Sequence, residues 1–316
     1  MSNFQTLRDD YRAAKAALLT TIGASGASTR GVSTALHRLS ALADATLQTL
    51  WQRAGCSSPF ALLAVGGFGR AELFPHSDVD VLVLLPDDQS PDTNPELKAR
   101  IEAFIGSCWD TGLEIGSSVR TISDCLAEAQ KDVTVQTSLL ESRLIVGDAR
   151  LMARFRKQFQ AAIDPRAFFV AKTLEMQQRH NRFENTPYSL EPNCKESPGG
   201  LRDLQVILWV AKAAGLAKNW DELARNGLAT PFEVKQIKHN EALLRLVRAR
   251  LHLTAGRRED RLVFDLQTAV AETFGYSSES ADGEGLPARA SEALMRRYYW
   301  TAKAVTQLNQ ILLLNI

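Results

Sequence analysis

The chain has 316 residues, of which 45% are hydrophobic and 23% charged, a size and composition typical of a folded protein with more than one domain. Its 37 basic and 36 acidic side chains leave a net charge of +1, which excludes a global electrostatic argument for binding nucleic acid or a membrane. No apolar run approaches the about 20 residues of a membrane span, and the charged opening "MSNFQTLRDDYRAAK" does not resemble a signal peptide. The four cysteines are far apart and form no CxxC pair, so we expect reduced thiols and a cytoplasmic protein.

The first half of the chain changes from a helical pattern to a strand pattern. Residues 1–55 have apolar positions every three or four residues on both sides of the break "GASGAST", which predicts a helical segment. Short apolar runs then predict strands at 60–65 and 79–85, joined by a short helix in "FGRAELF". A third strand is predicted at 113–122, "LEIGSSVRTI", after a helix that ends at Gly112.

From residue 123 onward the pattern predicts almost only helices, including one in "TVQTSLLESRLIV". An irregular stretch at 184–200 interrupts them, and a polar, glycine-rich loop is expected at 276–287. The predicted fold class is therefore α+β, with a small mixed sheet and its helices followed by an all-helical domain. The predicted domain limits are 1–55 for the N-terminal helical segment, 56–150 for the sheet domain and 151–316 for the helical domain.

Two aspartates, Asp78 and Asp80, open the apolar run of the second predicted strand. Residues two apart in a strand point the same way, so these carboxylates project together, about 6–7 Å apart. Two like charges held that close repel each other and gain nothing structurally. Divalent cations need such convergent oxygens, and the pair fits two Mg²⁺ ions about 4 Å apart that also bind substrate phosphates. The alternative is a solvated acidic pair that binds nothing.

The glycine pair Gly66 and Gly67 follows the first predicted strand. Backbone N–H groups at such a turn can cradle an anion, because glycine lets a phosphate approach closely. A Walker A motif is excluded because no Lys-Ser/Thr pair follows, and the dinucleotide fingerprint is excluded because its third glycine would fall at Glu72. Arg70, just after the turn, is a candidate to neutralise triphosphate charge, with a plain surface role as the alternative.

The order of strand, Gly-Gly, short helix and Asp-x-Asp on the next strand resembles the DNA polymerase β-type nucleotidyltransferase superfamily. The resemblance extends to one family, the bacterial protein-PII uridylyltransferase/uridylyl-removing enzymes, over residues 60–316. It rests on the stretches "VGGFGRAELFPHSDVDVLVL", "LEIGSSVRT", "ESRLIVGD", "QRHNRF" and "LEPNCKESPGGLRDLQVILWVAK". Of these, "SPGGLRD" is the most specific, because many nucleotidyltransferases share the first motif.

The resemblance implies that the glycine turn holds a triphosphate and that the aspartates hold the metal ions. It also implies a third carboxylate on a later strand, for which Glu114 is the candidate and Asp110, at the end of a helix, the alternative. A solvated charge on an edge strand is the alternative reading of Glu114. The expected cofactor is Mg²⁺, as two ions bound by Asp78, Asp80 and Glu114, with Mn²⁺ as a substitute.

The second domain offers further candidates in "CKESPGGLRD". Ser197 and Pro198 predict the start of a helix there. Gly199 and Gly200 would leave its first N–H groups bare, and these, with Lys195 and Arg202, form a candidate contact for the nucleotide. An ordinary capped helix is the alternative. His180 on the preceding helix is interpreted as a packing histidine.

The implied activity is transfer of UMP from UTP to a tyrosine of the PII nitrogen-signalling protein, with release of pyrophosphate. Adenylyl transfer to another protein such as glutamine synthetase, and a non-catalytic nucleotide sensor, stay open as alternatives, and no nucleic-acid or membrane partner is expected. Enzymes of the family continue into an HD phosphohydrolase domain and two ACT domains. No histidine here is followed by aspartate, so we expect a truncated piece that lacks the uridylyl-removing activity.

Overall fold

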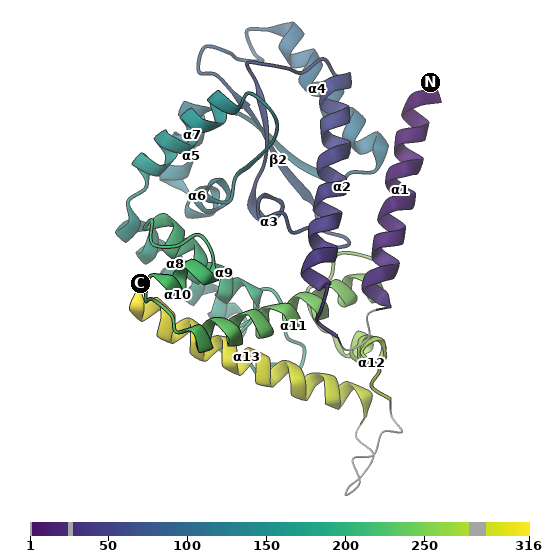
Figure 1. The fold of residues 1–316 in the computed structure, drawn as a ribbon, viewed down its shortest axis with the longest axis vertical. Helices are drawn as coiled ribbons and strands as arrows, with labels where there is room; N and C mark the ends of the chain where they lie inside the picture. The colour runs from purple at the N-terminus through teal and green to yellow at the C-terminus, as the bar shows by residue number, and fades with distance from the viewer. Residues whose placement is uncertain (1, 25–27, 278–288) are drawn as a thin grey trace, which may run out of the picture. The chain divides into compact units, whose positions relative to one another are not determined.

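The computed structural model describes residues 2–24, 28–277 and 289–316, so the loop expected at 276–287 lies almost wholly outside the described residues (Figure 1). The chain divides into two compact units. We call the first, Met1–Leu18, Thr34–Leu73 and Ser77–Ile163, the sheet unit, and the second, Leu19–Ser33, Phe74–His76 and Asp164–Ile316, the helical unit. The predicted domain limits stay a prediction, and the long final segment of the helical unit begins at Asp164.

The described part of the sheet unit holds a four-stranded sheet in the order β3-β2-β1-β4. Strands β1 and β2 are antiparallel, as are β1 and β4, whereas β2 and β3 are parallel. The sheet is therefore mixed, and the predicted α+β class is confirmed. The strands are β1 (Ala61–Ala64), β2 (Val79–Leu85), β3 (Ile115–Thr121) and β4 (Arg143–Gly147).

Three of these strands were predicted, but β4 was not. The prediction of one helix through "TVQTSLLESRLIV" is wrong, because helix α6 ends at Leu140 and the chain then turns into β4. The amide of Ser142 donates to the carbonyl of Leu139 in that turn. A short apolar run that continues a helical pattern has no periodicity of its own, so the sequence does not separate it from the end of a helix.

Strands β1 and β2 form the centre of the sheet. Every residue of β1 is buried, and so is every residue of β2 except Asp80. Helices α4, α5 and α7 contact the sheet. Trp51 of α2 meets Phe104 of α4 edge to face, with 5.2 Å between the ring centroids. The helices that begin in or belong to the sheet unit are α1 (Ser2–Gly23), α2 (Val32–Arg53), α3 (Gly66–Gly69), α4 (Pro95–Thr111), α5 (Ile122–Lys131), α6 (Val133–Leu140) and α7 (Ala149–Ala162).

The ends of helix α4 follow the chemistry of its sequence. Asn94 caps its start, because the side chain of Asn94 accepts a hydrogen bond from the amide of Leu97, and Pro95 occupies the first turn. Gly112 ends it in the left-handed conformation, with a φ of 90°. The predicted end of this helix is confirmed, and it delivers the chain directly into Glu114 and β3.

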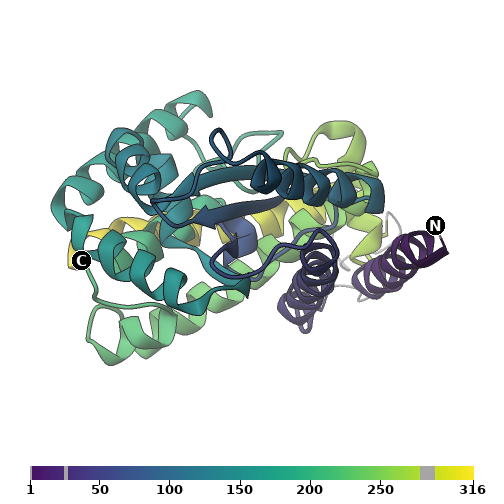
Figure 2. The ribbon, with the colours of Figure 1, turned by 90° about the horizontal axis from the view of Figure 1, so that it is seen from above.

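The helical unit contains only helices among its described regular elements. In Figures 1 and 2, α11 and α13 run side by side, and α12 and α9 also contact α13. The elements are α8 (Pro165–Arg182), α9 (Leu201–Ala213), α10 (Trp220–Arg225), α11 (Pro231–Ala255), α12 (Phe264–Thr273) and α13 (Ala290–Asn315). None of the described helices is both long enough and apolar enough to cross a membrane. The four cysteines are buried and free.

Candidate active site

The two aspartates lie where β2 begins. Asp78 is the residue before the strand, Asp80 is its second residue, and both are exposed. The main chain beside them is fixed, because the amide of Val79 donates to the carbonyl of Glu114 and the amide of Val65 donates to the carbonyl of Asp80. Asp80 is the one residue of β2 that is not buried, and Asp78 lies two residues before it. The sheet therefore presents two carboxylates at the start of a strand that is otherwise buried.

The carboxylate of Asp80 lies between two glycines. A Cβ atom at Gly66 would be 3.6 Å from Oδ2 of Asp80 and 3.6 Å from the hydroxyl of Ser138. On the other side, a Cβ atom at Gly116 would be 2.7 Å from Oδ1 of Asp80. Gly66 has a φ of 56°, in the left-handed region that favours glycine. The glycine turn and the first glycine of β3 thus leave space for the aspartate, and neither Ser138 nor Gly116 was named as part of the site from the sequence.

The glycine turn itself differs from the prediction. Gly66 and Gly67 do not precede a helix in "FGRAELF". They are the first two residues of α3, which ends at Gly69. Residues 70–78 are not helical: turns lie at 70–71 and 75–76, and Ala71 has a positive φ of 60°. The first N–H groups of a helix have no acceptor within the helix, so the amides of this turn can still donate to an anion.

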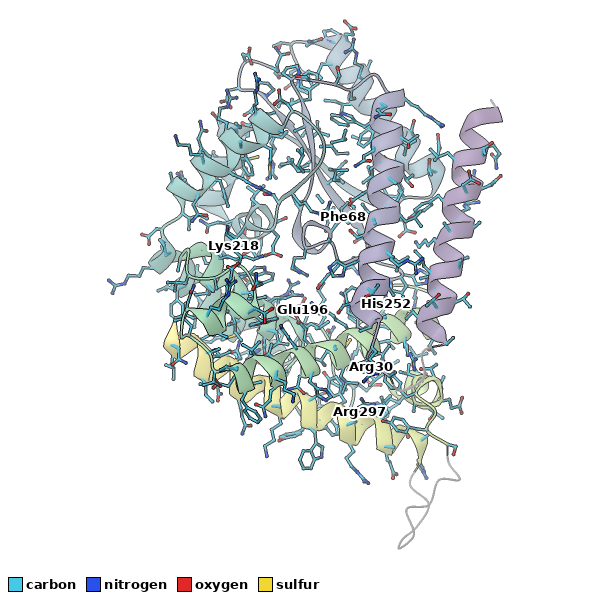
Figure 3. The ribbon with its side chains drawn as sticks, viewed as in Figure 1. Arg30, Phe68, Glu196, Lys218, His252 and Arg297 are labelled. Atoms are coloured by element: carbon cyan, nitrogen blue, oxygen red, sulfur yellow. The ribbon has the colours of Figure 1, made fainter. Side chains whose placement is uncertain are left out.

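Helix α3 is anchored by an arginine of β4, the strand that was not predicted from the sequence. Arg143 of β4 makes two bonds to the carboxylate of Asp44, at 2.8 and 3.1 Å, and donates to the carbonyl of Phe68 at 3.3 Å. Its guanidinium also lies over the ring of Phe68, which is labelled in Figure 3. These contacts join α2, β4 and α3, and they hold the glycine turn in position.

Arg70 lies beside the turn and is mostly buried. Its guanidinium is 3.4 Å from a carboxylate oxygen of Glu141 and 3.6 Å from one of Glu72. The side chain of Glu141 is 1% exposed. Two carboxylates therefore already balance the charge of Arg70. Because its side chain is mostly buried, Arg70 is not a plain surface residue.

Glu114 precedes β3 by one residue and is exposed. Its charge acts on α1: burial, and then Glu114, raise the pKa of Tyr11 to about 12. Burial lowers the pKa of Lys15, and Glu114 opposes that shift. Among the described residues, no three His, Cys, Asp or Glu side chains are grouped so that they could hold a metal ion. The assignment of Glu114 or Asp110 as a third metal ligand stays a prediction.

In the helical unit, the start of α9 is closed by hydrogen bonds. The amide of Gly199 donates to Asp203, that of Leu201 to the carbonyl of Cys194, and that of Arg202 to the carbonyl of Lys195. The prediction of bare N–H groups at this helix is therefore wrong. Ser197 is not the cap either, because the cap position is Gly200 and the hydroxyl of Ser197 accepts from the amide of Asn193.

The two glycines before α9 have steric roles. Gly199 has a φ of 79°, and a Cβ atom there would be 2.2 Å from the carbonyl oxygen of Ala302 in α13. A Cβ atom at Gly200 would be 2.9 Å from the carbonyl oxygens of Lys195 and Ser197. These distances explain both glycines by the close approach of neighbouring main chain. The amide of Gly199 donates to Asp203 and that of Gly200 to the carbonyl of Ser197, so neither is left for a nucleotide.

Asp203 organises this turn from inside the helical unit. It is fully buried and accepts hydrogen bonds from Arg179 at 2.6 Å and Gly199 at 2.7 Å, and its Oδ1 is 2.8 Å from Nε2 of His180. Burial opposes its ionisation, but the bond to His180 and the charge of Arg179 outweigh burial and lower its pKa. His180 is held by this buried carboxylate, and its interpretation as a packing histidine stays a prediction.

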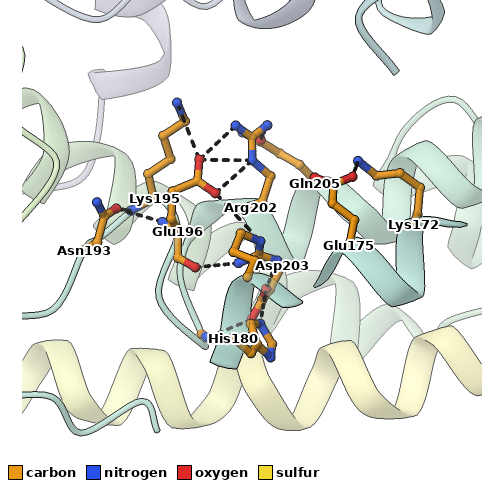
Figure 4. Close-up of polar contacts among 11 residues, drawn as sticks. Lys172, Glu175, His180, Asn193, Lys195, Glu196, Arg202, Asp203 and Gln205 are labelled. Atoms are coloured by element: carbon orange, nitrogen blue, oxygen red, sulfur yellow. Dashed lines mark hydrogen bonds and ion pairs between the residues drawn. The ribbon is translucent and has the colours of Figure 1, made fainter. Parts of the chain in front are cut away.

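The remaining candidates, Lys195 and Arg202, extend from the same turn in the same direction, with the carboxylate of Glu196 between them (Figure 4). Both side chains are about a quarter exposed. The structure therefore places Gly66 beside Asp80 and Gly67 beside Arg70 in the sheet unit, with Asp78 two residues before Asp80. It brings Lys195, Gly199, Gly200 and Arg202 together in the helical unit.

Two family models match different parts of the chain. The family described as putative nucleotidyltransferase DUF294 matches residues 14–115, which include the glycine turn, both aspartates and Glu114. The family described as GlnD PII-uridylyltransferase matches residues 167–313. The chain is thus similar to one family over part of its first half and to another over most of its second half.

Individual relatives extend this similarity over nearly the whole chain. The bifunctional uridylyltransferase/uridylyl-removing enzymes of Burkholderia mallei (strain ATCC 23344) and Burkholderia pseudomallei (strain K96243) are each 58% identical to this chain. The matches cover 97% of this chain and 34% of each relative. The chain is a relative of these uridylyltransferase/uridylyl-removing enzymes, as its motifs indicated. It spans about a third of the length of the curated relatives it matches.

Proposed function

We propose that this chain transfers UMP from UTP to the hydroxyl group of a tyrosine on a PII signalling protein and releases pyrophosphate. The observation that carries the proposal is the carboxylate of Asp80 between Gly66 and Gly116, two residues after Asp78. Uridylyl transfer and the PII acceptor come from the names of the matching family and relatives.

The residues present fit a divalent cation. Mg²⁺ in proteins is usually bound by one or two carboxylates together with waters and substrate phosphates, so a third protein carboxylate is not required. Asp78 and Asp80 are exposed, and glycine on each side of Asp80 leaves its oxygens accessible. These two aspartates would hold Mg²⁺ or Mn²⁺, which would neutralise the triphosphate and lower the pKa of the attacking hydroxyl.

The remaining chemistry is positioning. The tyrosine oxygen forms a bond to the α-phosphorus of UTP while the bond from that phosphorus to the bridging oxygen breaks, and pyrophosphate leaves with the electron pair. The phenol, with an ordinary pKa of about 10, releases its proton to solvent. Gly66 and Gly67 would donate backbone N–H groups to the phosphates, and Arg143 keeps their turn in place. Arg70 contributes less, because Glu72 and Glu141 already compensate its charge.

Within the helical unit by itself, Lys195 and Arg202 are proposed as cations that bind a phosphate group. Both are partly exposed, and Arg202 is supported by Gln205 and by the ring of Trp209 beneath its guanidinium. Guanidinium and ammonium groups bind phosphate oxygens through charge-assisted hydrogen bonds.

The test is transfer of label from α-³²P-UTP, in Mg²⁺, to purified PII protein and to a PII variant in which the acceptor tyrosine is phenylalanine. We expect label on the first acceptor and none on the second, and none on either when the chain carries Asp80→Asn. Label from α-³²P-ATP on glutamine synthetase would support adenylyl transfer instead. Nucleotide binding without transfer to PII would support the sensor.

A further inference from the structure

The carboxylate of Glu196 is surrounded by three cations. Arg202 approaches it most closely, with Nη2 2.9 Å from Oε1 and Nε 3.3 and 3.4 Å from the two oxygens. Nζ of Lys195 is 3.6 Å from Oε1, and Nε of Arg179 is 3.7 Å from Oε2. Figure 4 shows the carboxylate between the ends of Lys195 and Arg202. This arrangement is the one that cations adopt around an oxyanion.

The main chain that carries these groups is tightly fixed. The side chain of Asn193 accepts hydrogen bonds from the amides of Lys195, at 3.0 Å, and Glu196, at 2.8 Å. Arg179 donates to the carbonyl of Glu196 at 2.6 Å. Because the main chain is held and the side chains of Lys195, Glu196 and Arg202 are each about a quarter exposed, these side chains can exchange partners without unfolding the turn.

Positive charge is in excess at the accessible end of this cluster. Burial lowers the pKa of Lys195, and the charges of Arg248 and Arg202 lower it further, against the opposing effect of Glu196 and Asp260. Arg248 is itself paired with Asp260 at 2.6 Å, so the charge of Asp260 is already balanced by Arg248. Glu196 is thus the carboxylate that Lys195 and Arg202 share, and a second oxyanion at the same place would compete with it.

We propose that Lys195 and Arg202 form an oxyanion site for a phosphate group, and that Glu196 occupies this site as an internal competitor until the phosphate displaces it. The inference rests on the proposed function only for the natural ligand, a nucleoside triphosphate. Under this proposal Glu196 competes with the phosphate; the alternative is that Glu196 orients Lys195 and Arg202 for phosphate binding. An orienting carboxylate would strengthen phosphate binding, whereas a competitor weakens it.

The experiment measures calorimetric binding of inorganic pyrophosphate, without divalent metal, to a chain carrying Asp80→Asn. In this background neither the metal ions nor transfer contributes, so failure of the proposed function and failure of this inference are distinguishable. We expect Glu196→Gln to tighten binding about fivefold, because a carboxylate is removed from beside the bound anion. Lys195→Met and Arg202→Met should each weaken it about tenfold.

Matched variants exclude general effects. Glu191→Gln removes the same charge from the same segment, where Glu191 pairs with Arg261 at 3.1 Å, and it should leave pyrophosphate binding unchanged. If Glu196→Gln does not fold, Glu196→Asp replaces it in the experiment. This variant keeps the charge but shortens the side chain, and it should also tighten pyrophosphate binding. The inference is overturned if the folded Glu196 variants bind pyrophosphate no better than the parent, or if Glu191→Gln has an equal effect.

Discussion

Gly116 of β3 pairs in register with Asp80 of β2, and a Cβ atom at Gly116 would lie 2.7 Å from Oδ1 of that aspartate. Any side chain at this position would displace the carboxylate. The pairing of β2 with β3 therefore sets where the oxygens of Asp80 lie. The proposed chemistry thus depends on Gly116, although this residue has no side chain.

Gly116→Ala should lower kcat for uridylyl transfer about 100-fold, since displacement of a catalytic group by about 1 Å has an effect of that order. The melting temperature should change little, because β3 is an edge strand and alanine is acceptable there. Gly106→Ala is the matched control, since nothing lies within 4 Å of a Cβ atom at this exposed helical position. Steady-state kinetics check the prediction, and equal activity of the two variants would contradict it.

The ion pair of Arg143 and Asp44 gives a second prediction. Arg143→Gln should lower the free energy of unfolding by about 1–2 kcal/mol, because the pair is partly buried and Arg143 also donates to the carbonyl of Phe68. It should also lower transfer, because the glycine turn loses its anchor. A double-mutant cycle with Asp44→Asn, followed by urea denaturation, measures the coupling. A coupling energy near zero would mean that the pair does not hold α3.

The first three strands were predictable because continuous or alternating apolar runs mark them, and Asp78 and Asp80 stood out against that background. Gly116 was not recognised, since its role depends on a register with β2 that no local pattern gives. The closed start of α9 was missed for a similar reason. Its amides find acceptors at Cys194, Lys195 and Asp203, and the first two lie in a stretch whose conformation has no periodicity.

Asp203→Asn should destabilise the protein by about 3–5 kcal/mol, because it leaves the buried guanidinium of Arg179 without its full charge partner. Asp221→Asn is the control: its pair with Lys238 is exposed and should be worth less than about 1 kcal/mol. Chemical denaturation of both variants provides the comparison. Similar small losses in the two would show that Asp203 is not the centre of the turn.

His252 predicts a dependence of stability on pH. Burial lowers its pKa, against the opposing hydrogen bond to Asp260, and its Nδ1 accepts from the amide of His76. The unfolded chain, with a histidine pKa of about 6.5, therefore binds the proton more readily than the folded chain. The contribution of neutral His252 to the free energy of unfolding should be fully present above pH 6.5. It should decrease as the pH falls through 6.5 toward the lower pKa of the folded state.

Thermal unfolding between about pH 7.5 and 5 measures this effect, above the range in which carboxylates such as Asp260 titrate. His252→Gln should flatten the pH dependence, whereas His37→Gln, at an exposed position, should leave it unchanged. An unaltered slope in His252→Gln would place the titrating group elsewhere.

The proposed metal and nucleotide site is tested most directly by a crystal structure of the chain with Mg²⁺ and a UTP analogue that cannot be cleaved at the α-phosphate. We expect a cation about 2.1 Å from carboxylate oxygens of both Asp78 and Asp80, with the triphosphate against the amides of Gly66 and Gly67. A nucleotide bound elsewhere, with the two aspartates in contact only with solvent, would contradict it.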